Sequence, residues 1–204
     1  MARLPYVTGD ELPERHRPLL GSYSEMGAEY TPHVTSPPER EDGDDGSDVP
    51  PRLYQAMANN PPILEAFRRM ASTLRAECGL SERHREVVIL ASARATGAEY
   101  EWHHHVRIGR AVGLSVEEIR AIAEGRPGAF DAPEAALIGY TARLVEGTVD
   151  DATHEALVAQ FDEREAVGVA MVAQFYLGLS RVIEAFDLDI GEPFVGWELE
   201  RLEA

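Results

Sequence analysis

Residues 81–105 read SERHREVVILASARATGAEYEWHHH and predict two consecutive helices joined by a short turn. Ser81 is suited to cap the first helix, because its side-chain oxygen can accept a hydrogen bond from a backbone N–H in the first turn. An apolar run begins at Val87, and the helix is expected to end near Gly97, since glycine favours a left-handed helix end. A second helix is expected over 99–112. The short turn predicts that the two helices run antiparallel.

Helix start and stop signals recur on both sides of this stretch, whereas strand signals are almost absent. The sequence therefore predicts an all-α fold of mostly antiparallel helices. Further helices are expected within 10–30, 53–58, 63–78, 115–125, 131–145, 151–161 and 164–186. Residues 31–51 are rich in proline and acidic side chains, which predicts a loop without a core. We interpret 1–204 as a single domain with an N-terminal extension and this acidic, proline-rich loop.

Three of these helices have specific start signals. Ser115 followed by Glu118 is a capping box, in which each side chain bonds to the backbone N–H of the other residue. Asp131 precedes a proline and an acidic residue, an arrangement that favours a helix start. Asp151 is predicted to cap the helix that follows it.

Composition narrows the function classes. The chain has 19 basic and 36 acidic residues and a formal net charge of -17, so it should repel nucleic acid and anionic lipid surfaces. Its one cysteine, Cys78, excludes a disulfide within one chain and a dithiol redox cycle. The N-terminus lacks the apolar core of a signal peptide, and we expect a cytoplasmic protein.

The last long helix is apolar nearly all round between Ala166 and Leu179. Its uncharged run, 166–180, is too short to span a bilayer, so we expect it to be buried in the centre of the fold or at a subunit contact. The tail after Asp187 has apolar residues but no core of its own, and such a tail often packs on a partner.

Polar residues of the opening stretch suggest acid/base chemistry. Glu101 and His105 are four residues apart, roughly 40° apart around a helix axis, so their side chains can touch. A carboxylate beside an imidazole favours its protonated form and orients the ring. Glu86, on the preceding antiparallel helix, can approach both. Three residues from two helices can then form a proton relay, although a structural ion pair is the alternative.

A metal site formed by these three residues is a weaker alternative, because two carboxylates and one imidazole can bind divalent ions. His103, His104 and His105 cannot bind one ion together, since successive helical residues turn by about 100°. We expect His103 and His104 to face solvent or an interface. No metal and no cofactor are predicted.

Several motifs together resemble the carboxymuconolactone decarboxylase and alkyl hydroperoxidase D superfamily. They are Asn60-Pro61 before a helix, the segment 80–86, Tyr100-Glu101-Trp102 followed by His105, and the segment 113–119. Redox members of the family carry a glutamate, a Cys-x-x-Cys pair and a histidine in fixed spacing. Counted from Glu86, the cysteine positions fall on Ala98 and Glu101, and the histidine falls on His105. A carboxylate cannot replace a thiolate as the nucleophile, which argues against peroxidase activity.

The resemblance implies an alkyl hydroperoxidase D-like fold and, for a chain without the thiols, a decarboxylase-like lyase. In that interpretation His105 donates a proton to carbon, Glu101 orients it, and Glu86 is the second member of the relay. The substrate would be a small unsaturated or lactone carboxylate. Candidate substrate-binding residues are Tyr100, Trp102 and Arg94, with core packing as the alternative for the two aromatic rings. Arg83, Arg85 and Arg107 are further candidate anion binders, or partners in structural ion pairs.

The resemblance also implies a homo-oligomer, because family members are commonly dimers, trimers or hexamers. Two other functions stay open. One is a different proton-transfer reaction, such as isomerisation or dehydration in a catabolic or biosynthetic pathway. The other is a non-catalytic oligomeric binding protein. Neither a nucleic acid nor a membrane is an expected partner.

Overall fold

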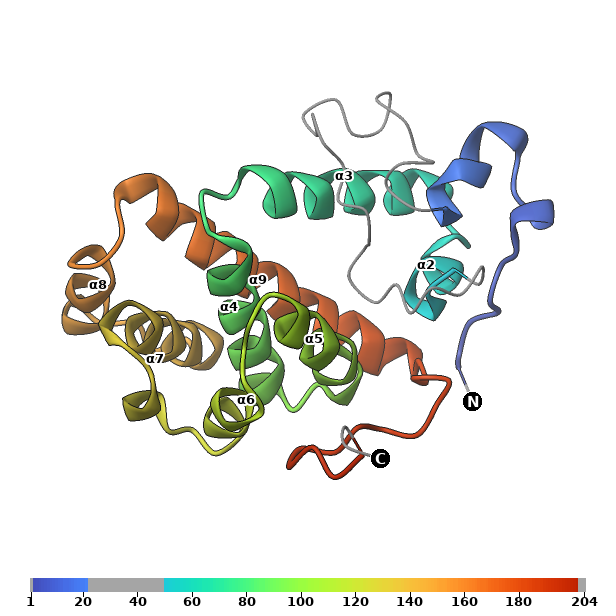
Figure 1. Ribbon diagram of the computed structural model, residues 1–204. Coiled ribbons are helices and arrows are strands. Elements are labelled where there is room, and N and C mark those ends of the chain that lie inside the picture. The colour runs from blue at the N-terminus through green and yellow to red at the C-terminus, as the bar shows by residue number, and fades with distance from the viewer. Residues whose placement is uncertain (1, 22–49, 202–204) are drawn as a thin grey trace. The chain divides into compact units, whose positions relative to one another are not determined.

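The computed structural model describes residues 2–21 and 50–201, and every regular element in these ranges is helical (Figure 1). The predicted all-α fold is confirmed for this part of the chain. The α-helices are α2 (Arg52–Met57), α3 (Pro61–Glu77), α4 (Glu82–Thr96), α5 (Glu99–Ala111), α6 (Val116–Ala123), α7 (Ala132–Glu146), α8 (Asp151–Val158) and α9 (Glu163–Phe186). Short 3-10 helices are η1 (Gly9–Glu11), η2 (Glu14–Leu20) and η3 (Pro127–Ala129). Of the predicted loop 31–51, only Pro50 and Pro51 are among the described residues.

The chain divides into two compact units, of which the first consists of Met1–Glu77 and Ile183–Gly191. The helix predicted within 10–30 begins after Pro13, but it is the 3-10 helix η2, and residues 22–30 lie outside the described ranges. Pro18 inside η2 has no N–H to donate, which disfavours a regular α-helix. Arg68 of α3 is buried and donates to the carbonyl of Gly21 just after η2.

The second unit consists of Cys78–Val182 and Glu192–Ala204 and holds α4 to α8 and most of α9. Its central helix is α4, which packs against α7 and α5. Every residue from Arg85 to Ala93 is buried, because the apolar run allows packing on more than one side. The charged side chains buried on α4 therefore lie inside the unit.

Most of the predicted helix starts are confirmed. Ser81 accepts a hydrogen bond from the His84 backbone N–H, and Ser115 and Glu118 form the capping box. Asp131 caps α7 through the N–H of Glu134. The prediction for α8 was wrong by one residue: Asp150 is the cap and Asp151 lies in the first turn. Both are aspartates, so local residue preference does not distinguish them.

α9 corrects two expectations. At 24 residues, with a mean hydropathy of 1.6 over its most apolar window, it is the one helix of the described chain long and apolar enough to cross a membrane. Core helices of globular proteins meet the same two criteria. It is not buried all round, because Val167 is 63% exposed and Met171 36% exposed. The backbone of Gly168, in contrast, approaches the carbonyl of Cys78 so closely that a Cβ would lie 2.0 Å from its oxygen.

The C-terminal tail packs within its own unit. Val195 and Leu199 are buried, and the Trp197 ring lies 5.2 Å from the ring of Trp102 on α5. A partner is therefore not needed to cover the apolar residues of the tail.

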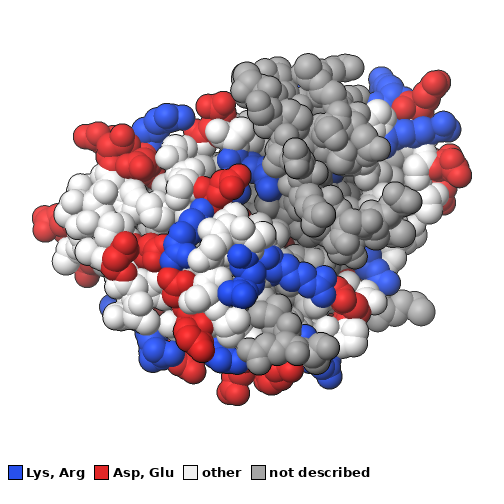
Figure 2. All heavy atoms as spheres, viewed as in Figure 1, with Lys and Arg blue, Asp and Glu red and all other residues white. Residues whose placement is uncertain are grey.

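The surface charges are mixed on the face shown in Figure 2, where arginine side chains lie among aspartates and glutamates. The net charge of -17 is accordingly not expressed there as one continuous acidic patch.

Candidate functional site

The turn between α4 and α5 places the acid/base residues on facing helices. Gly97, at φ 69°, closes α4 in the left-handed conformation, and α5 begins two residues later at Glu99. Gly97 tolerates this conformation because it has no Cβ. The chain therefore reverses within two residues, which allows a side chain early in α4 to meet one late in α5.

Glu86 and His105 meet across this turn. Nδ1 of His105 lies 2.7 Å from Oε2 of Glu86, a strong hydrogen bond. Nε2 of His105 lies 3.7 Å from Oε2 of Glu101, the residue one helical turn earlier. The side chains are 0% exposed for Glu86, 5% for Glu101 and 3% for His105. The structure thus brings the three predicted relay residues together in the interior of the unit.

The charges of this group are balanced by a buried cation. Nε of Arg85 lies 3.6 Å from Oε1 of Glu86, and its side chain is only 5% exposed. With both carboxylates ionised, one guanidinium leaves a net charge of -1, so binding a single proton makes the group neutral. Because burying an uncompensated charge is costly, the group favours holding one proton, which His105 and its carboxylate neighbours can share. We call Glu86, Glu101, His105 and Arg85 the relay cluster.

The position of Glu101 supports its ionised form. It lies in the first turn of α5, where the unpaired N–H groups of the helix create a favourable potential for an anion. Ala98, the other position at which redox relatives would carry a cysteine, is the N-cap residue of the same helix. The methyl group of Ala98 has no acid/base capacity, so the carboxylate is the chemically active replacement.

Tyr176 of α9 also contacts the relay cluster, and the sequence analysis did not single it out. Its ring centroid lies 5.0 Å from that of His105, with the rings nearly perpendicular at 89°. Tyr176 is half-buried, whereas the relay cluster is buried. The apolar composition of α9 hides this residue in the sequence, and only its polar hydroxyl in an apolar helix distinguishes it.

The predicted substrate-binding residues have packing contacts. The Tyr100 ring lies 4.5 Å from that of His104, and Trp102 is fully buried and donates from Nε1 to the carbonyl of Gly196 at 3.2 Å. Arg94 donates to the carbonyl of Ala123 and lies over the Trp197 ring. Arg94 is two turns beyond Glu86 on α4. Their assignment to substrate binding stays a prediction.

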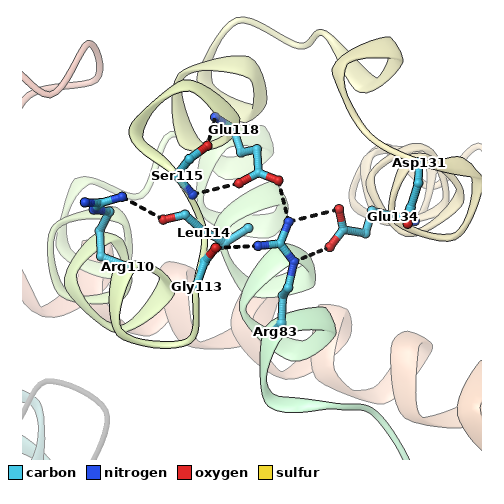
Figure 3. A network of polar contacts seen from close by, with 8 residues as sticks. All are labelled: Arg83, Arg110, Gly113, Leu114, Ser115, Glu118, Asp131 and Glu134. Carbon is cyan, nitrogen blue, oxygen red and sulfur yellow. Dashed lines mark hydrogen bonds and ion pairs between the residues drawn. The ribbon is translucent and has the colours of Figure 1, made fainter.

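Among the other candidate arginines, Arg83 joins three parts of the second unit (Figure 3). It donates from Nε to Glu134 on α7 at 2.7 Å, from Nη2 to Glu118 on α6, and from Nη1 to the carbonyl of Gly113 at 2.7 Å. The hydrogen bond to Glu134 raises the pKa of Arg83 further above its ordinary value. Arg83 therefore acts as a structural tie of the first turn of α4.

Arg107 pairs with Glu192 of the tail at 3.1 Å. Of the four arginines proposed as anion binders, Arg85 is the one placed in the relay cluster.

His103 differs from the expectation that it would face solvent or an interface. It is 1% exposed, its Nδ1 accepts from the backbone N–H of Val195, and its Nε2 bonds to Glu192. His104 is half-buried. As a metal ligand neither joins the relay: the described residues contain no group of three or more His, Cys, Asp or Glu side chains placed to hold a metal ion.

Comparisons with known proteins agree on the family and the fold. Residues 61–143 match the profile of the Carboxymuconolactone decarboxylase family. No curated protein matches the sequence significantly.

Solved structures are similar over most of the chain. The alkylhydroperoxidase AhpD core of an uncharacterized peroxidase-related protein from Ralstonia eutropha JMP134 has a TM-score of 0.68 and 17% identity, covering 97% of this chain and 97% of that chain. The debrominase Bmp8 in its apo form has a TM-score of 0.68 and 18% identity, covering 78% of this chain and 87% of that chain. Its cysteine-to-alanine variant with 2,3,4-tribromopyrrole gives 0.63 and 19%, covering 70% and 78%. These likenesses show an AhpD-like fold.

Proposed function

Because residues 61–143 belong to the carboxymuconolactone decarboxylase family, we propose that this chain is a lyase that uses proton transfer on a small unsaturated or lactone carboxylate, without thiol redox chemistry. The observation that carries the proposal is the 2.7 Å hydrogen bond between buried His105 and Glu86, with Glu101 near the other ring nitrogen. A buried imidazole held between two carboxylates is suited to general acid/base catalysis at neutral pH. A small-ring ligand is also named for one structural neighbour, the debrominase with tribromopyrrole.

The proton transfer begins with His105 in its protonated form. Ionised Glu86 accepts the Nδ1–H, which fixes the ring orientation, and Nε2–H is then the acid on the opposite side of the ring. When the bond between the substrate ring and its carboxylate breaks, carbon dioxide leaves and its bonding electrons form a dienolate. Nε2–H of His105 protonates the dienolate carbon. The neutral imidazole regains its proton from solvent, with Glu101 nearby to stabilise the positive charge.

A thiol mechanism of the family type lacks its reactive groups. Ala98 and Glu101 occupy the positions of the cysteine pair, and Cys78, the one cysteine of the sequence, is buried before α4. The carboxylate of Glu101 stabilises a cation and accepts a proton, whereas a thiolate donates electrons to a peroxide. The same pair of positions therefore serves acid/base chemistry in this proposal.

The test is turnover of carboxymuconolactone, followed by release of carbon dioxide. We expect His105→Gln to lower kcat by a factor of about 100 or more, because glutamine cannot donate the proton. His154→Gln, at an exposed position of α8, is the control and should keep wild-type kcat. Both variants should keep the wild-type circular dichroism spectrum. Wild-type turnover by His105→Gln would show that the assigned acid is wrong.

A second proton-transfer reaction uses the same relay cluster. Isomerisation needs a base and an acid at one site, and the cluster offers two carboxylates and one imidazole at different positions around the substrate. Mass spectrometry of the product separates the candidates. An isomerase leaves the mass unchanged, a dehydratase removes water, and the decarboxylase removes carbon dioxide. A binding protein would return its ligand unchanged with wild type and His105→Gln alike.

A further inference from the structure

Tyr176 stands at the boundary between the relay cluster and the outside of α9. Its ring meets His105 at 5.0 Å between centroids, and Phe175 beside it lies 5.6 Å from it. On the same helix Gln174 and Gly178, two residues away on either side, are exposed. Tyr176 is therefore the half-buried neighbour of a buried imidazole, on a helix that reaches the surface.

The chemistry of a tyrosine suits contact with a substrate at this position. Its ring presents a flat apolar face, and aromatic rings prefer flat partners at offset or edge-to-face geometry, by about 0.5–1.5 kcal/mol beyond the area they bury. The phenol is neutral at neutral pH, so it adds no charge to a cluster that already balances two carboxylates. A substrate that touches the ring of His105 shares that neighbourhood with the Tyr176 ring.

We infer that Tyr176 is a specificity-determining residue of this site, whose ring selects a flat, unsaturated ring over a puckered, saturated ring of the same size and charge. The inference rests on the proposed function, because it takes His105 as the group that the substrate meets. It adds to that function the residue that recognises the shape of the substrate. The hydroxyl of Tyr176 is not required for this selection.

Two matched carboxylates test the inference without turnover. Benzoate is flat and cyclohexanecarboxylate is puckered, while both carry one negative charge on a six-membered ring. Their dissociation constants are measured from shifts of the His105 imidazole NMR signals, which His105→Gln assigns by their loss. We expect wild type to bind benzoate about two- to tenfold more tightly than cyclohexanecarboxylate.

The variants separate the ring from the hydroxyl and from general packing. Tyr176→Phe keeps the ring and should keep the preference for benzoate, whereas Tyr176→Leu should lower the ratio of dissociation constants to about one. Phe175→Leu is the matched control, since Phe175 is also half-buried on α9, and it should keep the wild-type ratio.

Three results would overturn the inference: equal affinities in wild type, a preference that survives in Tyr176→Leu, or the absence of any His105 shift with benzoate up to its solubility limit. These results leave the turnover test of His105→Gln untouched. Conversely, wild-type turnover by His105→Gln removes the proposed function even if the preference for benzoate is found.

Discussion

At the scale of single residues, the three consecutive histidines of α5 occupy three different environments. His105 belongs to the relay cluster, and His103 is bonded to the tail through Val195 and Glu192. His104 packs against Tyr100, and its Nε2 is buried without a hydrogen-bond partner. The steps of about 100° per residue explain why three identical side chains meet three sets of neighbours.

We predict that His104 makes stability fall with acid. Burial, followed by repulsion from His103, His105 and Arg107, lowers the pKa of His104 from 6.5 to about 4. Between these values the unfolded chain binds a proton that the folded chain does not, so this contribution is complete above pH 6.5 and is lost as the pH falls towards 4. The loss amounts to about 3 kcal/mol.

Urea unfolding at a series of pH values from 7 to 4 measures this dependence. His104→Phe keeps a ring against Tyr100 and should make the free energy of unfolding less sensitive to pH, while exposed His154→Gln should leave the sensitivity unchanged. Identical pH dependence in wild type and His104→Phe would contradict the prediction.

The meeting of Glu86, Glu101 and His105 was accessible from the sequence because it depends on local geometry. One pair is four residues apart on a helix, and the other spans a single short turn at Gly97. The contact of Tyr176 with His105 joins distant parts of the chain, and neither helical periodicity nor residue preference encodes which distant residue arrives there. Arg85 was one of several equivalent arginines until the burial of α4 distinguished it.

At the scale of helices, the same contrast separates helix ends from helix faces. Caps such as Ser81 and Ser115 were predicted because a side chain bonds to a backbone N–H three residues away. The burial of α9 was predicted from composition, which cannot tell which face neighbouring helices cover. Its exposed side includes Val167 and Met171, and its close approach to Cys78 depends on one glycine.

We predict that Gly168→Ala destabilises the protein. The added Cβ would lie 2.0 Å from the Cys78 carbonyl oxygen, which belongs to the backbone and cannot rotate away. Overpacking of this kind costs about 1–3 kcal/mol or more. Gly178→Ala on the same helix is the matched control, because its Cβ would lie 3.7 Å from the nearest atom, the side-chain nitrogen of Gln174. It should gain about 0.5–1 kcal/mol from the higher helix propensity of alanine.

The midpoints of urea unfolding compare the two variants directly. A lower midpoint for Gly168→Ala and an equal or higher one for Gly178→Ala are expected. If both substitutions changed the midpoint equally, the close approach of α9 to Cys78 would not limit the residue at position 168.

At the scale of the whole molecule, a net charge of -17 opposes self-association, since copies of the chain repel one another. Any homo-oligomer must therefore be held by apolar contacts and should be favoured by salt, which screens the repulsion over about 10 Å at 0.1 M. Val167 and Met171, one helical turn apart on α9, provide exposed apolar side chains on one face. We propose that this face of α9 mediates a homo-oligomer.

Substitution of this face should dissociate the oligomer. Val167→Asp and Met171→Asp together would place two carboxylates in an apolar contact between chains that already repel one another, and burying unpaired charges is strongly unfavourable. Sedimentation equilibrium should give an oligomer for wild type, with a dissociation constant that falls as salt rises, and a monomer for the double variant. Val158→Asp, at an exposed apolar position of α8, is the control and should keep the wild-type mass. A monomeric wild type, or an oligomer that persists in the double variant, would rule out the α9 contact.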